Sequence, residues 1–257
     1  VRNVLGQEIA PAARVQEGYT EVASERLEAA AASVPGGTAT KTIVATGDPA
    51  TEILRVAGEE RADLIAMTAS GAGAWGPFAF GRVVDRVARA NARPVLVVPP
   101  SARSEGARVA GILVPVDGSE AAFAALPVAA TLANAFGVEV RVVQAVSADR
   151  EAAGPAEIAH PDVIEREFRG ASRSVAESAV AEAVARLQRM GVSARGDVLT
   201  GNPVATVISE AARTDLVVLT SRGQGQHAGA ASVSWTIGGV ADKLLRSGTL
   251  PMVLVPA

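Results

Sequence analysis

Short apolar runs alternate with longer stretches in which apolar residues recur at helical spacing, and this alternation predicts an α/β protein. Residues 63–67, 95–98, 215–219 and 252–255 are short, mainly apolar runs without polar alternation, which is typical of strands buried on both faces of a parallel sheet. Residues 108–257 carry the complete order β-α-β-α-β-α-β-α-β. This order predicts an open parallel sheet with helices on both faces.

The remaining elements of the second half follow from the same patterns. Upstream of Thr200 we expect a strand at 109–116, an alanine-rich helix at 120–136, a strand at 138–146, a polar loop at 147–166 and a long helix at about 168–190. Downstream we expect one helix that runs to about Arg213 and another at about 239–247. The matching helices of the first half are expected to run to about Glu60 and to cover about 82–91.

The chain also repeats itself. Residues 46–71 read TGDPATEILRVAGEERADLIAMTASG, and residues 200–223 read TGNPVATVISEAARTDLVVLTSRG. Both open with Thr-Gly, a residue that can cap a helix and a proline that suits the first helical turn. A second match joins residues 93–99 to residues 250–256. These matches in the same order indicate a duplication.

The first copy lacks a counterpart to the start of the second. Only 45 residues precede Thr46, and residues 15–34 match the long helix of the second copy. The first strand, first helix and second strand therefore have no match. We expect about 46 further residues at the N-terminus and a natural chain of about 300 residues. The expected division is a first domain at 1–100 without its first β-α-β, a linker at 101–107 and a complete second domain at 108–257.

Composition excludes several classes of function. A net charge of −3 and 3% aromatic residues argue against a nucleic-acid partner. The absence of cysteine excludes disulfides and thiolate metal sites and suits a reducing compartment, so we expect a cytoplasmic protein. His160 and His227 are too few for a His-rich metal site. No apolar run reaches the ~18–20 residues of a membrane span, so no membrane association is expected.

Candidate binding residues gather where the strands of the second copy end. In open parallel sheets, ligands bind at the carboxyl ends of the strands, where the strand order reverses. Those ends carry Pro115, Asp117, Val146 and residues 220–223, and a helix begins near Gly238. Glycine amides and a helix N-terminus favour a phosphate. Asp117 can accept hydrogen bonds from a ribose hydroxyl or an adenine amine, or it can cap the next helix, or both.

These segments resemble the universal stress protein family, over 108–257 in full and over 15–100 as the later part of a first copy. The family's nucleotide-binding members carry Gly-x2-Gly-x9-Gly-Ser/Thr after the fourth strand and an Asp that closes the first strand. The second copy fits this opening with ILVPVDGSE at residues 112–120, and Gly-Asn-Pro at 201–203 and Gly-Asp-Pro at 47–49 also fit. The resemblance implies a cytoplasmic regulatory protein of Rossmann-like, adenine-nucleotide α-hydrolase-like fold. It also implies binding of ATP or a related adenine nucleotide, which Mg²⁺ can accompany.

The phosphate motif of the second copy departs from the family pattern. Thr220-x2-Gly223 is followed by 14 residues before Gly238, so the loop is five residues longer than x9. Gly239 stands where the family has a hydroxyl. The loss of one hydrogen bond to a charged phosphate would weaken binding by roughly 1.5–3 kcal/mol. Micromolar binding through the remaining backbone donors is compatible with this loss.

The first copy keeps the x9 spacing in Thr68-x2-Gly71-x9-Gly81-Arg82. Thr68 replaces the first glycine of the family motif, and Arg82 replaces its hydroxyl residue with a charged donor. The resemblance places the nucleotide-binding residues of the second copy at Pro115, Asp117, Val146, Leu219, Thr220, Gly223, Gly238, Gly239 and Val240. In the first copy it places Met67, Thr68, Gly71, Gly81, Arg82 and Val83, and the segment that would supply an Asp has no match.

The resemblance further implies that the strands at 95–98 and 252–255 pair between the two copies, as an intrachain pseudo-dimer. A homodimer through these strands is a second arrangement that the same apolar edges favour.

Other functions stay open as alternatives. Gly71-Ala-Gly-Ala-Trp-Gly76 is a literal Rossmann dinucleotide motif, but the next strand ends at Pro99 without the acidic residue that such a site needs. The comparable strand ends also lack the Asp and Lys of a response-regulator receiver. No pattern pairs a nucleophile with a base or two carboxylates with each other, so we expect no enzyme. The remaining alternatives are a structural or interaction module of the same fold and a slow ATP hydrolase.

Overall fold

The computed structural model describes residues 12–69, 81–90, 92–102, 108–146, 161–212, 214–221 and 237–257. Contacts divide the chain into two units, Val1–Glu52 and Ile53–Ala257. The first unit contains α1 (Ala12–Ala32) and the start of α2 (Pro49–Glu59). Of residues 18–32, none is buried, and Tyr19 is 72% exposed. None of the helices built from the described residues is long and apolar enough to cross a lipid bilayer.

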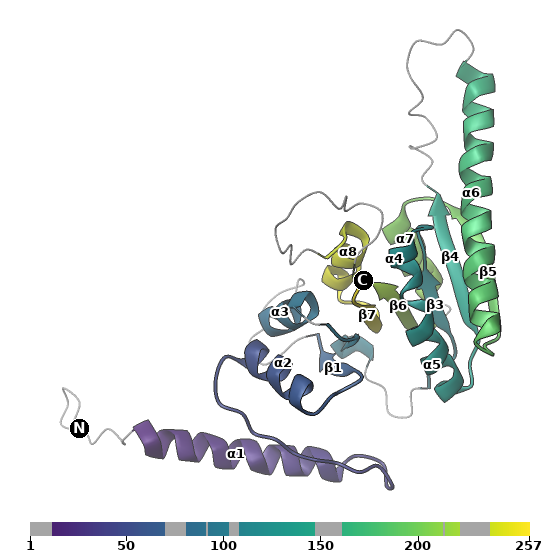
Figure 1. The fold of residues 1–257 in the computed structure, drawn as a ribbon. Coiled ribbons are helices and arrows are strands. Elements are labelled where there is room, and N and C mark those ends of the chain that lie inside the picture. Colours follow the sequence, from purple (N-terminus) through teal and green to yellow (C-terminus); the bar gives the residue numbers. More distant parts are fainter. Residues whose placement is uncertain are drawn as a thin grey trace, which may run out of the picture. The chain divides into compact units, whose positions relative to one another are not determined.

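The second unit is built around one seven-stranded sheet (Figure 1). Its strands are β1 (Ile65–Thr68), β2 (Val95–Val98), β3 (Ile112–Pro115), β4 (Val140–Val146), β5 (Ala194–Thr200), β6 (Leu216–Thr220) and β7 (Met252–Val255). They lie in the order β1-β2-β7-β6-β3-β4-β5, and every pair is parallel except β2 with β7. The mostly parallel sheet confirms the expected α/β class, and the apolar runs of β6 and β7 are buried on both faces, as expected for inner strands of such a sheet.

Helices cover both faces of this sheet. They are α3 (Arg82–Ala90), α4 (Glu120–Phe123), α5 (Leu126–Phe136), α6 (Pro161–Arg189), α7 (Pro203–Ala211) and α8 (Gly239–Ser247), with a short 3₁₀ turn η1 (Pro100–Ala102). One core joins α4, α5 and α6 to alternate strand residues such as Ile112, Val142 and Val218. The residues between these point to the other face, where Arg141 of β4 meets Glu210 of α7. In Figure 1, α6 runs alongside β4 and β5.

The last strands of the two copies join them. Val95, Leu96 and Val97 of β2 pair antiparallel with Leu254, Val253 and Met252 of β7, and the two strands have the bounds that the sequence predicts. The expected intrachain pairing is therefore present. It makes one continuous sheet of the two strands of the first copy and the five of the second.

The repeated Thr-Gly-Asp/Asn-Pro segments have the same local conformation. Gly47 and Gly201 have φ values of 151° and 152°, in the region that favours glycine. The Asp48 carboxylate accepts a hydrogen bond from the amide of Thr51, and the Asn202 side chain accepts from two amides in the first turn of α7. The duplication therefore extends to the hydrogen bonds that start each helix.

The strands expected at 109–116 and 138–146 are shorter, at Ile112–Pro115 and Val140–Val146, and two expected helices are also wrong in their bounds. The helix expected over 120–136 is broken into α4 and α5 by a turn at Ala124 and Ala125. The cause is Pro127, which has no N–H to donate to Phe123 and whose ring crowds that carbonyl. The long helix begins at Pro161 rather than at about 168, since proline suits a first helical position. The loop expected at 147–166 is correspondingly shorter, and residues 147–160 lie outside the described residues.

Candidate functional site

The carboxyl ends of β3, β4 and β6 meet at one edge of the sheet. Chain order reverses at β3, which lies between β4 and β6. The register pairs Leu216 with Ile112, so Thr220, at the end of β6, lies level with Val116, just after β3. Asp117 follows at once, and the ladder beside it continues through the hydrogen bond from the Val116 amide to the Val143 carbonyl, 2.9 Å long. The fold therefore brings Pro115, Asp117 and Thr220 to the reversal point of the second copy.

Asp117 is held by the turn that follows β3. Its Oδ1 accepts hydrogen bonds from the Ser119 amide at 3.0 Å and the Ser119 hydroxyl at 2.6 Å. Ser119 is the N-cap of α4, and its Oγ accepts from the Ala122 amide at 3.0 Å. Gly118 has φ 81°, a conformation that glycine adopts without strain. The alternative of Asp117 as the N-cap is thus wrong, because Ser119 fills that position and Asp117 orients Ser119.

The loop after β6 is closed at its base by two backbone hydrogen bonds. The Ser221 amide donates to the Val255 carbonyl at 2.8 Å, and the Ser221 carbonyl accepts from the Gly238 amide at 2.6 Å. Gly238 was expected to donate to a phosphate, but its amide is engaged in this closure. Gly223 and the rest of 222–236 lie outside the described residues.

Gly239 and Val240 form the first turn of α8, next to this closure. Gly238 is the N-cap of α8 and provides no side-chain hydrogen bond to it. The first amides of a helix have no partner within the helix, and the first such bond of α8 is donated by Asp242, so α8 offers the amides of Gly239, Val240 and Ala241 at this edge. No atom of the described residues lies within 4 Å of a Cβ placed on Gly239.

The first copy repeats the closure with a shorter loop. The Ala69 amide donates to Val98 at 2.8 Å, and the Gly81 amide donates to Ala69 at 2.9 Å. Arg82 starts α3 and is exposed, and Val83 beside it is half-buried. On β1, Met67 is half-buried and Thr68 is exposed, whereas Leu219 and Thr220 of β6 are buried. Gly71 lies outside the described residues, as does the Gly71–Gly76 motif.

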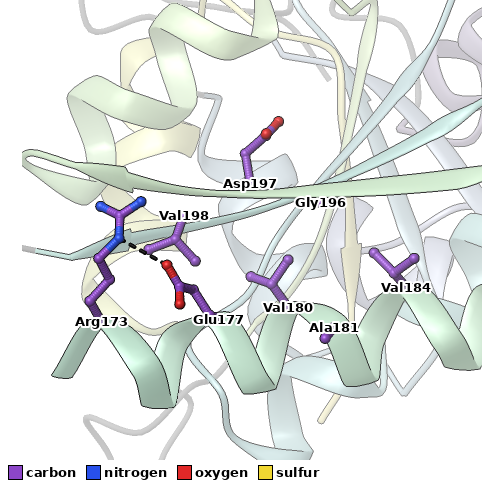
Figure 2. A pocket seen from close by; sticks show the side chains of 8 residues that line it. All are labelled: Arg173, Glu177, Val180, Ala181, Val184, Gly196, Asp197 and Val198. Atoms are coloured by element: carbon purple, nitrogen blue, oxygen red, sulfur yellow. Dashed lines mark hydrogen bonds and ion pairs between the residues drawn. The ribbon is translucent and has the colours of Figure 1, made fainter. Parts of the chain in front are cut away.

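Two further features of the second copy were not expected. Arg141 is 11% exposed on β4 and forms ion pairs with Asp197 at 2.9 Å and with Glu210, whose side chain is also 11% exposed. An arginine inside the apolar run VEVRVV is a signal that could have revealed this network. The second feature is a hollow of ≈ 420 Å³ between α6 and β5, shown in Figure 2.

The hollow lies beside the outer strand of the sheet. Val180 and Val184 of α6 and Val198 of β5 supply its apolar lining, and Arg173 and Glu177 form an ion pair at 2.9 Å in it (Figure 2). None of the nucleotide-binding residues expected from the sequence lines it. The hollow therefore lies where α6 packs against β5. Gly196 allows this close approach, because a Cβ at that position would lie 3.0 Å from Val184.

Comparisons with known proteins agree with this architecture. The model of the universal stress protein family matches residues 2–99 and again residues 111–256. The chain belongs to the universal stress protein family. A search of curated proteins found no match.

Solved universal stress proteins share the fold. One from Archaeoglobus fulgidus DSM 4304 has a TM-score of 0.65 at 19% identity, over 100% of this chain and 83% of that one. A putative universal stress protein from Pseudomonas aeruginosa UCBPP-PA14 has a TM-score of 0.56 at 14% identity, over 97% and 80% of the two chains. A functionally unknown protein, PA1789, from Pseudomonas aeruginosa PAO1 has a TM-score of 0.58 at 15% identity, over 92% and 77%.

Proposed function

We propose that the second copy binds ATP or a related adenine nucleotide and that the protein is regulatory rather than catalytic. The observation that carries the proposal is the arrangement at the strand reversal. There the Asp117 turn follows β3, and the uncapped first turn of α8 follows the loop after β6. A carboxylate on one side suits a ribose or adenine donor, and helix amides on the other suit a phosphate. Mg²⁺ can accompany the nucleotide.

The residues proposed to contact the nucleotide keep their expected roles with one change. Pro115, Val146, Leu219 and Thr220 would flank the base and ribose. Gly239 and Val240 would provide amides to the phosphates, and Gly223 would join them. Gly238 would act through the closure of the loop rather than as a direct donor, because its amide already bonds to Ser221.

A site in the first copy would use Met67, Thr68, Gly71, Gly81, Arg82 and Val83, the counterparts of the proposed residues at the end of β6 and the start of α8. In this proposal the functional domains are residues 1–100 and 108–257 with a linker at 101–107. The expected homodimer through the last strands is wrong, because β2 lies between β1 and β7, and β7 lies between β2 and β6, so both edges of each strand are already paired within the chain.

Calorimetric titration with ATP at millimolar concentration tests the proposal. We expect micromolar to submillimolar binding by the wild type and at least a tenfold loss in Asp117→Ala, since about 1.5–3 kcal/mol attaches to a hydrogen bond with a charged group. Asp215→Ala is the matched control, because it removes the same charge at the opposite end of the sheet, where Asp215 accepts from the Ala110 amide. No heat with the wild type would remove the proposal.

Two alternatives give different results. A structural or interaction module that has lost its ligand is favoured by the missing hydroxyl at Gly239, and it predicts no nucleotide in mass spectra of the denatured, freshly purified protein. A slow hydrolase predicts steady release of ADP from bound ATP. Nucleotide recovered without ADP release would support the regulatory proposal over both.

A further inference from the structure

The turn that carries Asp117 depends on a very short helix. Asp117 bonds to Ser119, and Ser119 caps α4 through the Ala122 amide. α4 has four residues, Glu120–Phe123. One helical turn has no stability of its own, because its ordering costs more than its hydrogen bond returns. Contacts from outside the turn must therefore fix α4, and with it the direction of the Asp117 carboxylate.

A single side chain of α6 supplies contacts to both ends of α4. Arg186 donates to Glu120 through two nitrogens, at 2.8 and 3.0 Å. The centre of its guanidinium also lies 4.6 Å from the centroid of the Phe123 ring. The bidentate ion pair with Glu120 fixes the plane of the guanidinium, and the contact with the Phe123 ring fixes its distance from that ring.

The guanidinium is itself oriented from within α6. Its Nε donates to Glu182 at 2.8 Å, one turn earlier. The contacts with Glu120 and Glu182 raise the pKa of Arg186, and the hydrogen bond from Arg186 lowers the pKa of Glu120. Ala183 and Leu187, which flank this turn of α6, are fully buried in the core with β3 and β4. Arg186 therefore extends from a rigid part of the molecule.

We propose that Arg186 is a positioning residue for Asp117. Ala122 and Phe123 pack α4 into the core, and Arg186 adds the contacts with Glu120 and the Phe123 ring that fix its first turn, which holds Ser119 and the Asp117 carboxylate at the strand reversal. The expected effect on nucleotide affinity rests on the proposed function, whereas the expected effect on the order of the Asp117 turn does not depend on it.

Amide hydrogen exchange in the full chain without nucleotide tests the positioning directly. In Arg186→Ala we expect the Ser119 and Ala122 amides to exchange about three- to tenfold faster, while the amides of β6 and the unfolding temperature change little. The matched control is Arg189→Ala, since Arg189 also pairs with Glu182, at 3.4 Å, on the exposed side of α6. It should leave both amides unchanged.

A conservative variant separates an orienting contact from mere bulk. Arg186→Lys keeps the charge but lacks the planar fork that donates to Glu120 through two nitrogens, so it should recover only part of the protection that Arg186→Ala loses. Unchanged exchange in Arg186→Ala would overturn the proposal.

ATP titration of the same variants gives the second measurement. If the wild type binds, Arg186→Ala should weaken binding about three- to tenfold and Arg189→Ala should not. Normal affinity in Arg186→Ala would overturn the positioning role. If the wild type itself does not bind, the proposed function fails, and faster exchange of the two amides would still support the positioning of the turn.

Discussion

β1 and β6 come from the same repeated sequence but occupy different surroundings. β6 lies between β3 and β7, and all five of its residues are buried. β1 pairs with β2 and, among the described strands, ends the sheet, and two of its four residues are exposed. The shared pattern therefore gives a strand in both copies, whereas the neighbours decide how much of that strand is buried.

The segments that precede the repeat in the two copies also depend on their neighbours for their structure. β5 precedes the repeat in the second copy and pairs along its whole length with β4. Residues 39–46, which precede the repeat in the first copy and are rich in Thr, Val and Ile, form no strand. β-branched residues favour strands only where a partner is present to complete the ladder.

The largest effect should come from breaking the ion-pair network of Arg141, Asp197 and Glu210 in the second copy. Arg141→Ala would leave the Glu210 carboxylate buried without its main partner, which costs about 3–5 kcal/mol. The free energy of unfolding in urea would measure this loss. The double variant Arg141→Met/Glu210→Leu should recover most of it, and a loss as large as that of the single variant would show that the charges themselves are needed.

Matched truncations of the two strands should differ clearly. Leu219 is 4% exposed on β6, and Met67, its counterpart on β1, is half-buried. We expect Leu219→Ala to lower the free energy of unfolding by about 2–4 kcal/mol and Met67→Ala by about 1 kcal/mol or less. Equal losses in urea unfolding would mean that β1 is as well packed as β6.

Restoring a hydroxyl should affect the second copy alone. Gly239→Ser adds a donor at the start of α8, where no atom of the described part of the chain comes within 4 Å of a Cβ, so ATP affinity should rise about tenfold. Arg82→Ser makes the equivalent change in the first copy and should leave calorimetric affinity unchanged. A gain from Arg82→Ser would indicate that the first copy binds.

The smallest difference in the free energy of unfolding between matched variants should come from Asp85 of α3 and Asp242 of α8. Asp242 accepts from Arg246 at 2.7 Å and Arg89 at 2.8 Å, whereas its counterpart Asp85 accepts from Arg89 at 2.9 Å. We therefore expect Asp242→Asn to cost about 1 kcal/mol and Asp85→Asn about half of that in urea unfolding.

These charges also give a pH dependence with a definite sign. The hydrogen bonds from Arg246 and Arg89 lower the pKa of Asp242 below its ordinary 3.8. A lowered pKa in the folded state means that the stabilisation is complete above pH ~4 and is lost as the pH falls through the lowered value. Melting temperatures between about pH 5 and 2 should therefore fall less steeply in Asp242→Asn than in the wild type.

Much of the fold could be predicted because local signals and burial agree. The strands at 95–98 and 252–255 have their expected bounds, since a proline follows each apolar run. The break before α5 was missed because alanines favour a helix strongly enough to hide the effect of Pro127. Arg186 could not be found from sequence, because its partners Glu120 and Phe123 lie more than 60 residues away, and only packing brings them together.

The segments that follow β1 and β6 differ in length, but the backbone hydrogen bonds at their ends are the same. The segment between Ala69 and Gly81 has 11 residues, and the segment between Ser221 and Gly238 has 16, yet each is closed by the same backbone bonds. The entropy of closing a loop grows only logarithmically with its length, so the five extra residues cost only about 0.3 kcal/mol. In closure entropy alone, a change in the length of either segment therefore costs little, so selection can change these lengths while the sheet stays unchanged.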